Sequence, residues 1–257
     1  MNDLSLTVNL LGEKATRRGR PYSRFVGCLA MPNIYSQLAA LASGVVFSSL
    51  AAAAPFQAQV LDQQGQPVVD AVLTLQGPPG KSSITAKADM DQRNKEFVPH
   101  VLAVHTGTNV TFPNSDNIRH QVYSFSPAKK FELRLYEGTP AAPLVMDKAG
   151  LVVLGCNIHD WMLGYIYVTD DPWFAVSDAK GQISFADLPT GRYRVTLWHP
   201  QNADMATQSG GELVVDDKPQ QKTYKMTLEP LSADAPSAPA PSAFGDAFGK
   251  ALRETEK

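Results

Sequence analysis

The sequence has little of several features that usually indicate a protein's class. Only two of its 257 residues are cysteines, Cys28 and Cys156. It has no excess of basic residues, because 23 Lys and Arg face 25 Asp and Glu for a formal net charge of −2, so the composition gives no support to a nucleic-acid partner. An apolar fraction of 44% is ordinary for a globular protein and excludes a disordered or collagen-like chain. The length allows one large domain or two small ones.

The sequence also lacks the common catalytic motifs. It contains no GxSxG, no HExxH, no phosphate-binding glycine loop and no GxGxxG after a strand. Its acidic residues are scattered, and no pair of carboxylates stands out. We therefore expect a protein that is not an enzyme.

No long helical period is present, and the chain after Pro55 consists of short Val-, Ile-, Phe- and Tyr-rich runs. Turn signals separate these runs at a spacing typical of antiparallel sandwiches. The clearest turns are at 62–67, 77–80, 105–108, 113–117, 178–181 and 188–191. The sequence therefore predicts an all-β fold.

The first 54 residues are typical of a secretory signal peptide. Four arginines between positions 17 and 24 precede an apolar run over 38–50, and Ala52–Ala54 form a small-residue cleavage site. A transmembrane anchor is the alternative, although serines and a glycine dilute the apolar run. Arg17 and Arg18 leave a twin-arginine export route open, and Met31 is a possible alternative start. We expect export to the periplasm, with cleavage near Ala54 and no membrane span afterwards.

Cleavage at that point would change the chemistry of the chain. It removes five basic and two acidic residues, so the formal net charge becomes −5. It also removes Cys28 and leaves Cys156 as the only thiol. A solitary cysteine in an exported protein is a free thiol, an intermolecular bridge or a metal ligand.

The residues around Cys156 favour the metal ligand. The sequence CNIHDWM places Cys156, His159 and Met162 at CxxHxxM spacing, which combines a thiolate, an imidazole and a thioether. A thiolate and two histidines in a plane, with a weak axial methionine, form the blue-copper electron-transfer site. The second histidine should come from elsewhere in the chain, and His120 is the candidate.

Two segments give a specific resemblance to the cupredoxins of the plastocyanin and amicyanin kind. The first is FVPHVLAVHTGTNVTFPNSDNIRHQV, residues 97–122, and the second is GLVVLGCNIHDWMLGYIYV, residues 150–168. The resemblance covers residues 86–170 and implies a cupredoxin Greek-key β-sandwich that holds one type 1 Cu ion. It implies His120, Cys156, His159 and Met162 as the ligands.

The chain departs from this family at two places. Gln121 stands where the family usually has an asparagine that ties the two ligand loops together. Leu154 and Gly155 stand where an aromatic residue usually precedes the cysteine. Inside the ligand loop, we expect Asp160 to be a solvated or loop-bracing carboxylate and Trp161 to pack over the site.

Two further histidines are expected to be structural. Strand period over 97–104 places His100 on one face with Leu102 and Val104, and we expect that face to be buried. A second metal site of His100 with His105 is not expected, because residues five apart point to opposite faces. His199 ends a strand and is expected to be structural or interfacial.

A second module flanks the first. VSDAKGQISFADLPTGRYRVTLWHP, residues 176–200, resembles the second half of a carboxypeptidase-regulatory-like or transthyretin-like sandwich, and 58–75 resembles its first half. We therefore predict a signal peptide at 1–54, the first strands of this smaller β-sandwich at 55–85, the cupredoxin at 86–170, the rest of the smaller sandwich at 171–230, and an Ala/Pro/Ser-rich flexible tail at 231–257. Tandem packing of the two modules is the alternative to this nested arrangement.

The expected function is one-electron transfer between redox partner proteins. Proteins of this type resemble those catalogued as methylamine-utilisation proteins. The partner would be a protein rather than a nucleic acid, docking where His159 lies near the surface among apolar residues, and the chain would be a monomer. The alternatives are a periplasmic copper carrier, store or sensor, and a surface-assembly protein in which copper only stabilises the fold.

Overall fold

The computed structural model describes residues 53–79, 87–140 and 142–230, all of which belong to one compact unit. Within these residues the secondary structure is β-strand throughout, apart from one short 3-10 helix, η1 (Ala203–Met205). The prediction of an all-β fold is confirmed. No helix among the described residues has the length and apolar character needed to cross a membrane.

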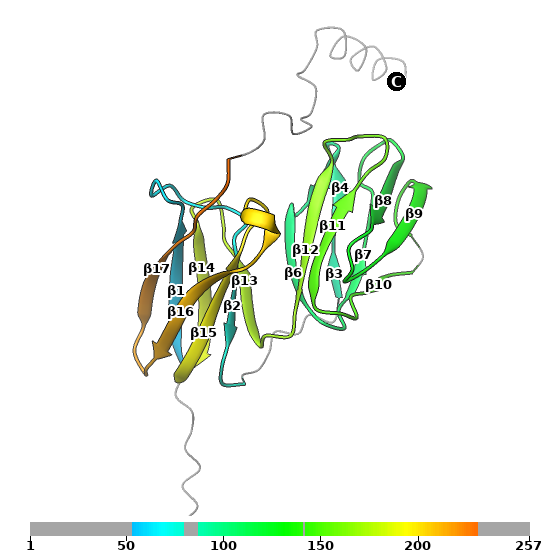
Figure 1. The fold of residues 1–257 in the computed structure, drawn as a ribbon. Helices are drawn as coiled ribbons and strands as arrows, with labels where there is room; N and C mark the ends of the chain where they lie inside the picture. Colours follow the sequence, from blue (N-terminus) through cyan, green and yellow to red (C-terminus); the bar gives the residue numbers. More distant parts are fainter. Residues whose placement is uncertain (1–52, 80–86, 141, 231–257) are drawn as a thin grey trace, which may run out of the picture. The chain divides into compact units, whose positions relative to one another are not determined.

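The larger sandwich has a five-stranded sheet in the order β6-β12-β11-β8-β9 and a three-stranded sheet in the order β10-β7-β3, with a small hairpin of β4 and β5 beside them (Figure 1). Its strands are β3 (Lys87–Asp89), β4 (Asp91–Arg93), β5 (Glu96–Val98), β6 (Val101–His105), β7 (Asn109–Thr111), β8 (His120–Ser124), β9 (Phe131–Tyr136), β10 (Leu144–Val145), β11 (Gly150–Gly155) and β12 (Leu163–Thr169). In the five-stranded sheet the order of the strands differs from their order in the sequence. The edge strand β6 pairs in parallel with β12, which comes much later in the chain.

Alternation along the strands builds the core of this sandwich. In β8 the side chains of His120, Val122 and Ser124 are buried, while those between them are partly exposed. His120 therefore shares the inner face with Val122. One buried cluster joins these inner faces and contains Val110 of β7 as well as Cys156 and Met162. The candidate ligands thus lie at the margin of a continuous apolar core.

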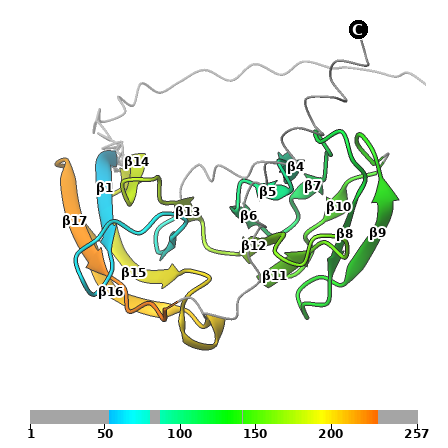
Figure 2. The ribbon, with the colours of Figure 1, turned by 90° about the horizontal axis from the view of Figure 1, so that it is seen from above.

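The smaller sandwich has a sheet in the order β14-β1-β17 and a sheet in the order β13-β2-β15-β16. Its strands are β1 (Ala53–Leu61), β2 (Val72–Gln76), β13 (Trp173–Val176), β14 (Gln182–Pro189), β15 (Gly191–Trp198), β16 (Gln208–Val215) and β17 (Gln220–Lys225). Figure 2 shows β1 and β17 facing β15 and β16. Residues of both sheets, among them Phe56, Leu73 and Val195, form one buried cluster between them.

The strands that pair with β1 and β2 indicate whether the two sandwiches are nested or follow one another in the chain. β1 pairs with β14 and β17, and β2 pairs with β13 and β15. All four partners follow residue 170 in the chain. This is the pairing that a nested arrangement requires, and on it we propose that the larger sandwich is inserted into the smaller one.

A third buried cluster combines residues of the two sandwiches: Val72 of β2, Val101 of β6, Tyr165 of β12 and Trp198 of β15. The Trp198 ring lies 5.8 Å from that of Tyr165 and 5.5 Å from that of Tyr167, measured between centroids. Its Nε1–H donates to the Met205 carbonyl.

The expectation of a buried His100 is wrong. The strand does not run through it, because β5 ends at Val98 and β6 starts at Val101, with Pro99 between them. Proline has no N–H with which to continue a ladder. The His100 side chain is 49% exposed, and its Nδ1 lies 2.9 Å from an Asp70 carboxylate oxygen. His199 is buried, and its Nε2 lies 3.1 Å from the Val69 carbonyl oxygen, which fits the structural role expected of it.

The predicted signal peptide and tail lie almost wholly outside the described residues. β1 starts at Ala53, two residues before the predicted domain boundary at Pro55. Ala54 pairs with Leu188 and is only 2% exposed. The strand therefore begins on the leader side of the predicted cleavage point.

Candidate metal centre

The loop Cys156–Met162 carries three of the four predicted ligands, and a β-hairpin holds both of its ends. β11 and β12 pair from Gly150 with Val168 to Gly155 with Leu163, so the loop starts and ends at neighbouring positions of the sheet. Within the loop, the Met162 N–H donates to the His159 carbonyl at 2.9 Å. This turn bends the chain so that His159 comes back toward Cys156.

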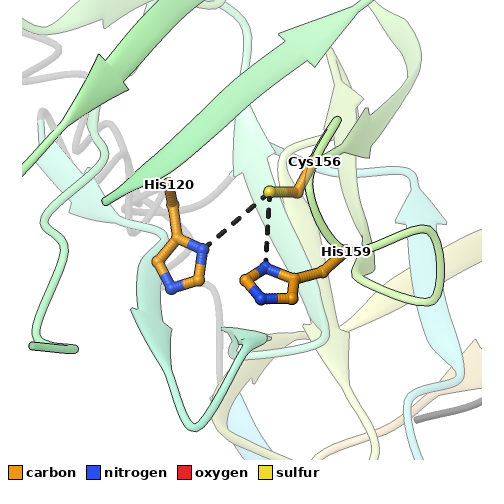
Figure 3. Close-up of side chains that lie close together, drawn as sticks. All are labelled: His120, Cys156 and His159. Atoms are coloured by element: carbon orange, nitrogen blue, oxygen red, sulfur yellow. Dashed lines mark hydrogen bonds between the residues drawn. The ribbon is translucent and has the colours of Figure 1, made fainter. Parts of the chain in front are cut away.

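His120 reaches the same point from another strand. It is the first residue of β8, which lies beside β11 through the pairing of Tyr123 with Gly155. The Cys156 Sγ lies 3.8 Å from His120 Nδ1 and 3.9 Å from His159 Nδ1. The three ligand atoms lie within 4.8 Å of one another. Figure 3 shows both rings turned toward the sulfur.

These separations fit a single ion bound in a trigonal plane. Nitrogen and sulfur ligands of a first-row ion such as zinc stand about 2.05 and 2.3 Å from the metal. At an angle of 120° such bonds place nitrogen and sulfur about 3.8 Å apart. The observed distances of 3.8 and 3.9 Å match this value. The residues present therefore fit a two-histidine, one-cysteine metal site.

The far side of the His120 ring contacts a carboxylate. Its Nε2 lies 2.7 Å from the Asp116 Oδ2, and the ring itself is fully buried. Burial opposes ionisation of Asp116, but hydrogen bonds from the Lys95 N–H, the His120 ring and the Asn94 N–H outweigh it and lower the pKa of Asp116. An ionised carboxylate can only accept, so Nε2 is the nitrogen that donates to Asp116, and Nδ1 is the nitrogen turned toward Cys156.

The segment before His120 is held by Asn114. Its Nδ2 donates to the Ile118 carbonyl at 2.8 Å and to the Tyr136 carbonyl at 3.0 Å, and its Oδ1 accepts from the Asp116 N–H. The side chain is 6% exposed. This network fixes the loop that presents Asp116 to His120.

His159 lies closer to solvent than His120. It is partly exposed, and its ring centroid lies 5.1 Å from that of Trp161 and 5.0 Å from that of His120. Burial and then the charges of His120 and Lys95 lower the pKa of His159, against the opposing charge of Asp116. The neutral ring, which is the form that binds a metal, is therefore favoured at neutral pH.

The remaining predicted residues have different outcomes. Met162 is 1% exposed and belongs to the same buried cluster as Cys156, while its role as axial ligand stays a prediction. Asp160 is exposed, as expected of a solvated carboxylate. The Gln121 Nε2 donates to Glu132 at 2.8 Å, so this amide is directed at β9 rather than at the cysteine loop. Trp161 packs on His159, as predicted.

Tyr123 lies against Gly155, the residue directly before the cysteine. A Cβ on Gly155 would lie 2.6 Å from Tyr123 Cζ, so this ring covers the glycine directly. The Phe125 ring lies 5.2 Å from that of Tyr123, and Phe125 is 77% exposed. Tyr123 and Asp116 are the site residues that sequence reasoning missed. The one available signal was the position of Asp116 four residues before His120.

Comparisons with known proteins give partial likenesses. No family model matches the chain, and no curated protein matches it. A copper-containing nitrite reductase from Thermus scotoductus SA-01 is similar at 24% identity and a TM-score of 0.31, over 32% of this chain and only 22% of the reductase. A purple cupredoxin from Nitrosopumilus maritimus matches at 22% identity and a TM-score of 0.28, over 32% of this chain and 98% of its own. A reduced amicyanin variant matches at 20% identity and a TM-score of 0.29, over 37% and 99%.

Proposed function

We propose that this chain is a periplasmic type 1 copper protein that carries one electron at a time between redox partners, and that it is not an enzyme. One Cu ion would be held by His120, Cys156 and His159, with Met162 as the axial ligand. The observation that carries the proposal is the placement of two imidazole nitrogens 3.8 and 3.9 Å from one buried thiol.

The ligand chemistry supports copper and electron transfer. A site of two histidines and a cysteine with a weak axial ligand is the blue-copper arrangement. Three of the four predicted ligands come from one hairpin loop and the fourth, His120, from the neighbouring strand of the same sheet, and His120 and Cys156 are both buried. A framework fixed in this way would let the metal change oxidation state with little ligand movement.

The exposed side chains next to His159 support a docking surface for the partner. Ile158, which precedes the partly exposed His159, is 47% exposed, and Leu163, which directly follows the ligand loop, is 40% exposed. A small apolar surface beside a metal ligand suits the brief encounters of electron-transfer proteins. The partner would be a redox protein with an apolar face of similar size, and the chain would meet it as a monomer.

Export to the periplasm is part of the proposal. Because Ala54 is buried in β1 and paired with Leu188, cleavage before Ala53 would preserve the whole strand. N-terminal sequencing of the exported protein should therefore give a start at or before Ala53. A start at Pro55 or later would contradict this placement and return the cleavage to the predicted position.

One optical experiment tests the function. The full chain, loaded with Cu(II), should show an intense thiolate charge-transfer band in the visible range that disappears on reduction and returns on oxidation. Absence of a visible band under oxidising conditions would contradict the proposal. A colourless Cu(I) complex that exchanges its metal readily would favour a copper carrier instead.

A further inference from the structure

We propose that Asp116 is a positioning residue that sets the reduction potential of the copper site by holding His120 through a charged hydrogen bond. This inference rests on the proposed function and goes beyond its ligand set. The Asp116 Oδ2 lies 2.7 Å from His120 Nε2, on the side of the ring opposite to Cys156. The carboxylate thus touches the ligand without facing the metal position.

Asp116 is itself fixed by a second element. The two residues of the turn between β4 and β5, Asn94 and Lys95, have φ angles of 54° and 61°. Their N–H groups donate to Asp116 at 2.7 and 2.9 Å, one to each carboxylate oxygen. With the His120 N–H, the carboxylate accepts three hydrogen bonds. The β4–β5 turn therefore holds the carboxylate in place, and the carboxylate holds the ring.

This arrangement has a direct consequence for the metal. A carboxylate that accepts from the outer nitrogen of a ligating histidine fixes the tautomer and makes the ligand nitrogen more basic. A more basic ligand and a nearby negative charge both favour Cu(II) over Cu(I). The intact pair should therefore lower the reduction potential, and its loss should raise it.

The variant Asp116→Asn tests this inference in the full copper-loaded chain. The Cu(II) affinity should fall about 10- to 100-fold, as is usual when such a partner is lost. If the Cu(I) affinity changes little, even a tenfold loss corresponds to a rise in potential of about 59 mV for one electron. Asp116→Glu, which keeps the charge, should restore most of the difference.

Asp160→Asn is the matched control. Asp160 is exposed and lies in the ligand loop next to His159, so this variant removes the same charge near the metal without touching His120. It should shift the potential much less than Asp116→Asn does. Equal shifts in the two variants would show a general charge effect and would overturn the positioning role of Asp116.

If Asp116→Asn fails to fold, a measurement on the unmodified chain still tests the inference. Nitrogen-15 NMR of the metal-free protein should show His120 with its proton on Nε2, exchanging slowly with water. An Nδ1–H tautomer, or an Nε2 proton in fast exchange, would overturn the inference. This readout needs no copper, so it stays separate from failure of the proposed function, which would appear as a chain that never binds copper through Cys156.

Discussion

At the scale of single residues, His199 shows how a structural histidine can be told from a ligand. Its Nε2 lies 3.1 Å from the Val69 carbonyl oxygen, and its Nδ1 accepts from the Gln201 N–H at 3.1 Å. One ring nitrogen therefore donates and the other accepts, which describes a neutral ring with both positions satisfied. In contrast, His120 and His159 direct a nitrogen at a thiol.

His199 also gives a prediction for pH dependence. Burial, together with the nearby His100, lowers the pKa of His199 against the opposing effects of the Val69 carbonyl and Asp70. The unfolded chain therefore takes up a proton near pH 6.5 while the folded chain does not, so stability falls as the pH drops from about 7 toward the lower, folded-state pKa. The uptake of one proton on unfolding changes the free energy of unfolding by at most about 1.4 kcal/mol per pH unit.

Urea unfolding of the metal-free protein between pH 7 and 5 measures this slope. His199→Gln keeps a donor for the Val69 carbonyl but cannot titrate, so the free energy of unfolding should depend less steeply on pH in the variant. Equal slopes for the variant and the unmodified protein would show that His199 does not contribute.

At the scale of elements, close packing constrains the β11–β12 hairpin, which holds the ligand loop. Gly164 pairs with Leu154 inside this hairpin, and a Cβ there would lie 2.7 Å from Phe97 Cβ. Gly164→Ala should therefore destabilise the protein by about 1–3 kcal/mol, the usual cost of overpacking a core. Chemical denaturation measures the loss.

A double-mutant cycle provides the control for this change. In Phe97→Gly the obstructing Cβ and ring are both gone, so adding Gly164→Ala should cost clearly less than it does in the unmodified chain. Strictly additive costs would contradict the contact between these two positions.

The elements also show what sequence could and could not predict about the site. CxxHxxM spacing and an upstream histidine predicted His120, Cys156 and His159, whose ligand atoms the structure brings together, because two of them need only one hairpin loop. Met162 as a ligand stays a prediction. Asp116 and Tyr123 could not be found in this way. Asp116 depends on a turn at Asn94 and Lys95 more than twenty residues earlier, and Tyr123 depends on the pairing of β8 with β11. His100 was predicted wrongly because period two was continued through Pro99.

At the scale of the whole molecule, we predict that the cluster around Trp198 links the stability of the two sandwiches. Trp198 is 1% exposed and contacts Tyr165 and Tyr167 of the larger sandwich from a strand of the smaller one. Trp198→Ala should cost about 3–5 kcal/mol, as expected for the loss of a buried aromatic side chain. It should also separate the unfolding of the two sandwiches.

Calorimetry distinguishes a simple loss of stability from separate unfolding of the two sandwiches. The unmodified chain should unfold in one transition and Trp198→Ala in two. Trp173→Leu is the control, because Trp173 packs against the core of the smaller sandwich and does not belong to the cluster around Trp198, with its ring 6.3 Å from that of Phe185. That variant should lower the transition temperature without dividing the transition. One transition in both variants would refute the coupling through Trp198.

The composition of the metal's first coordination shell tests the central claim most directly. X-ray absorption at the copper edge of the full, Cu-loaded chain should show one sulfur and two nitrogen ligands in that shell. In Cys156→Ser the sulfur contribution should vanish together with the visible band. A first shell without sulfur in the unmodified protein, or one unchanged in Cys156→Ser, would contradict a copper site built on His120, Cys156 and His159.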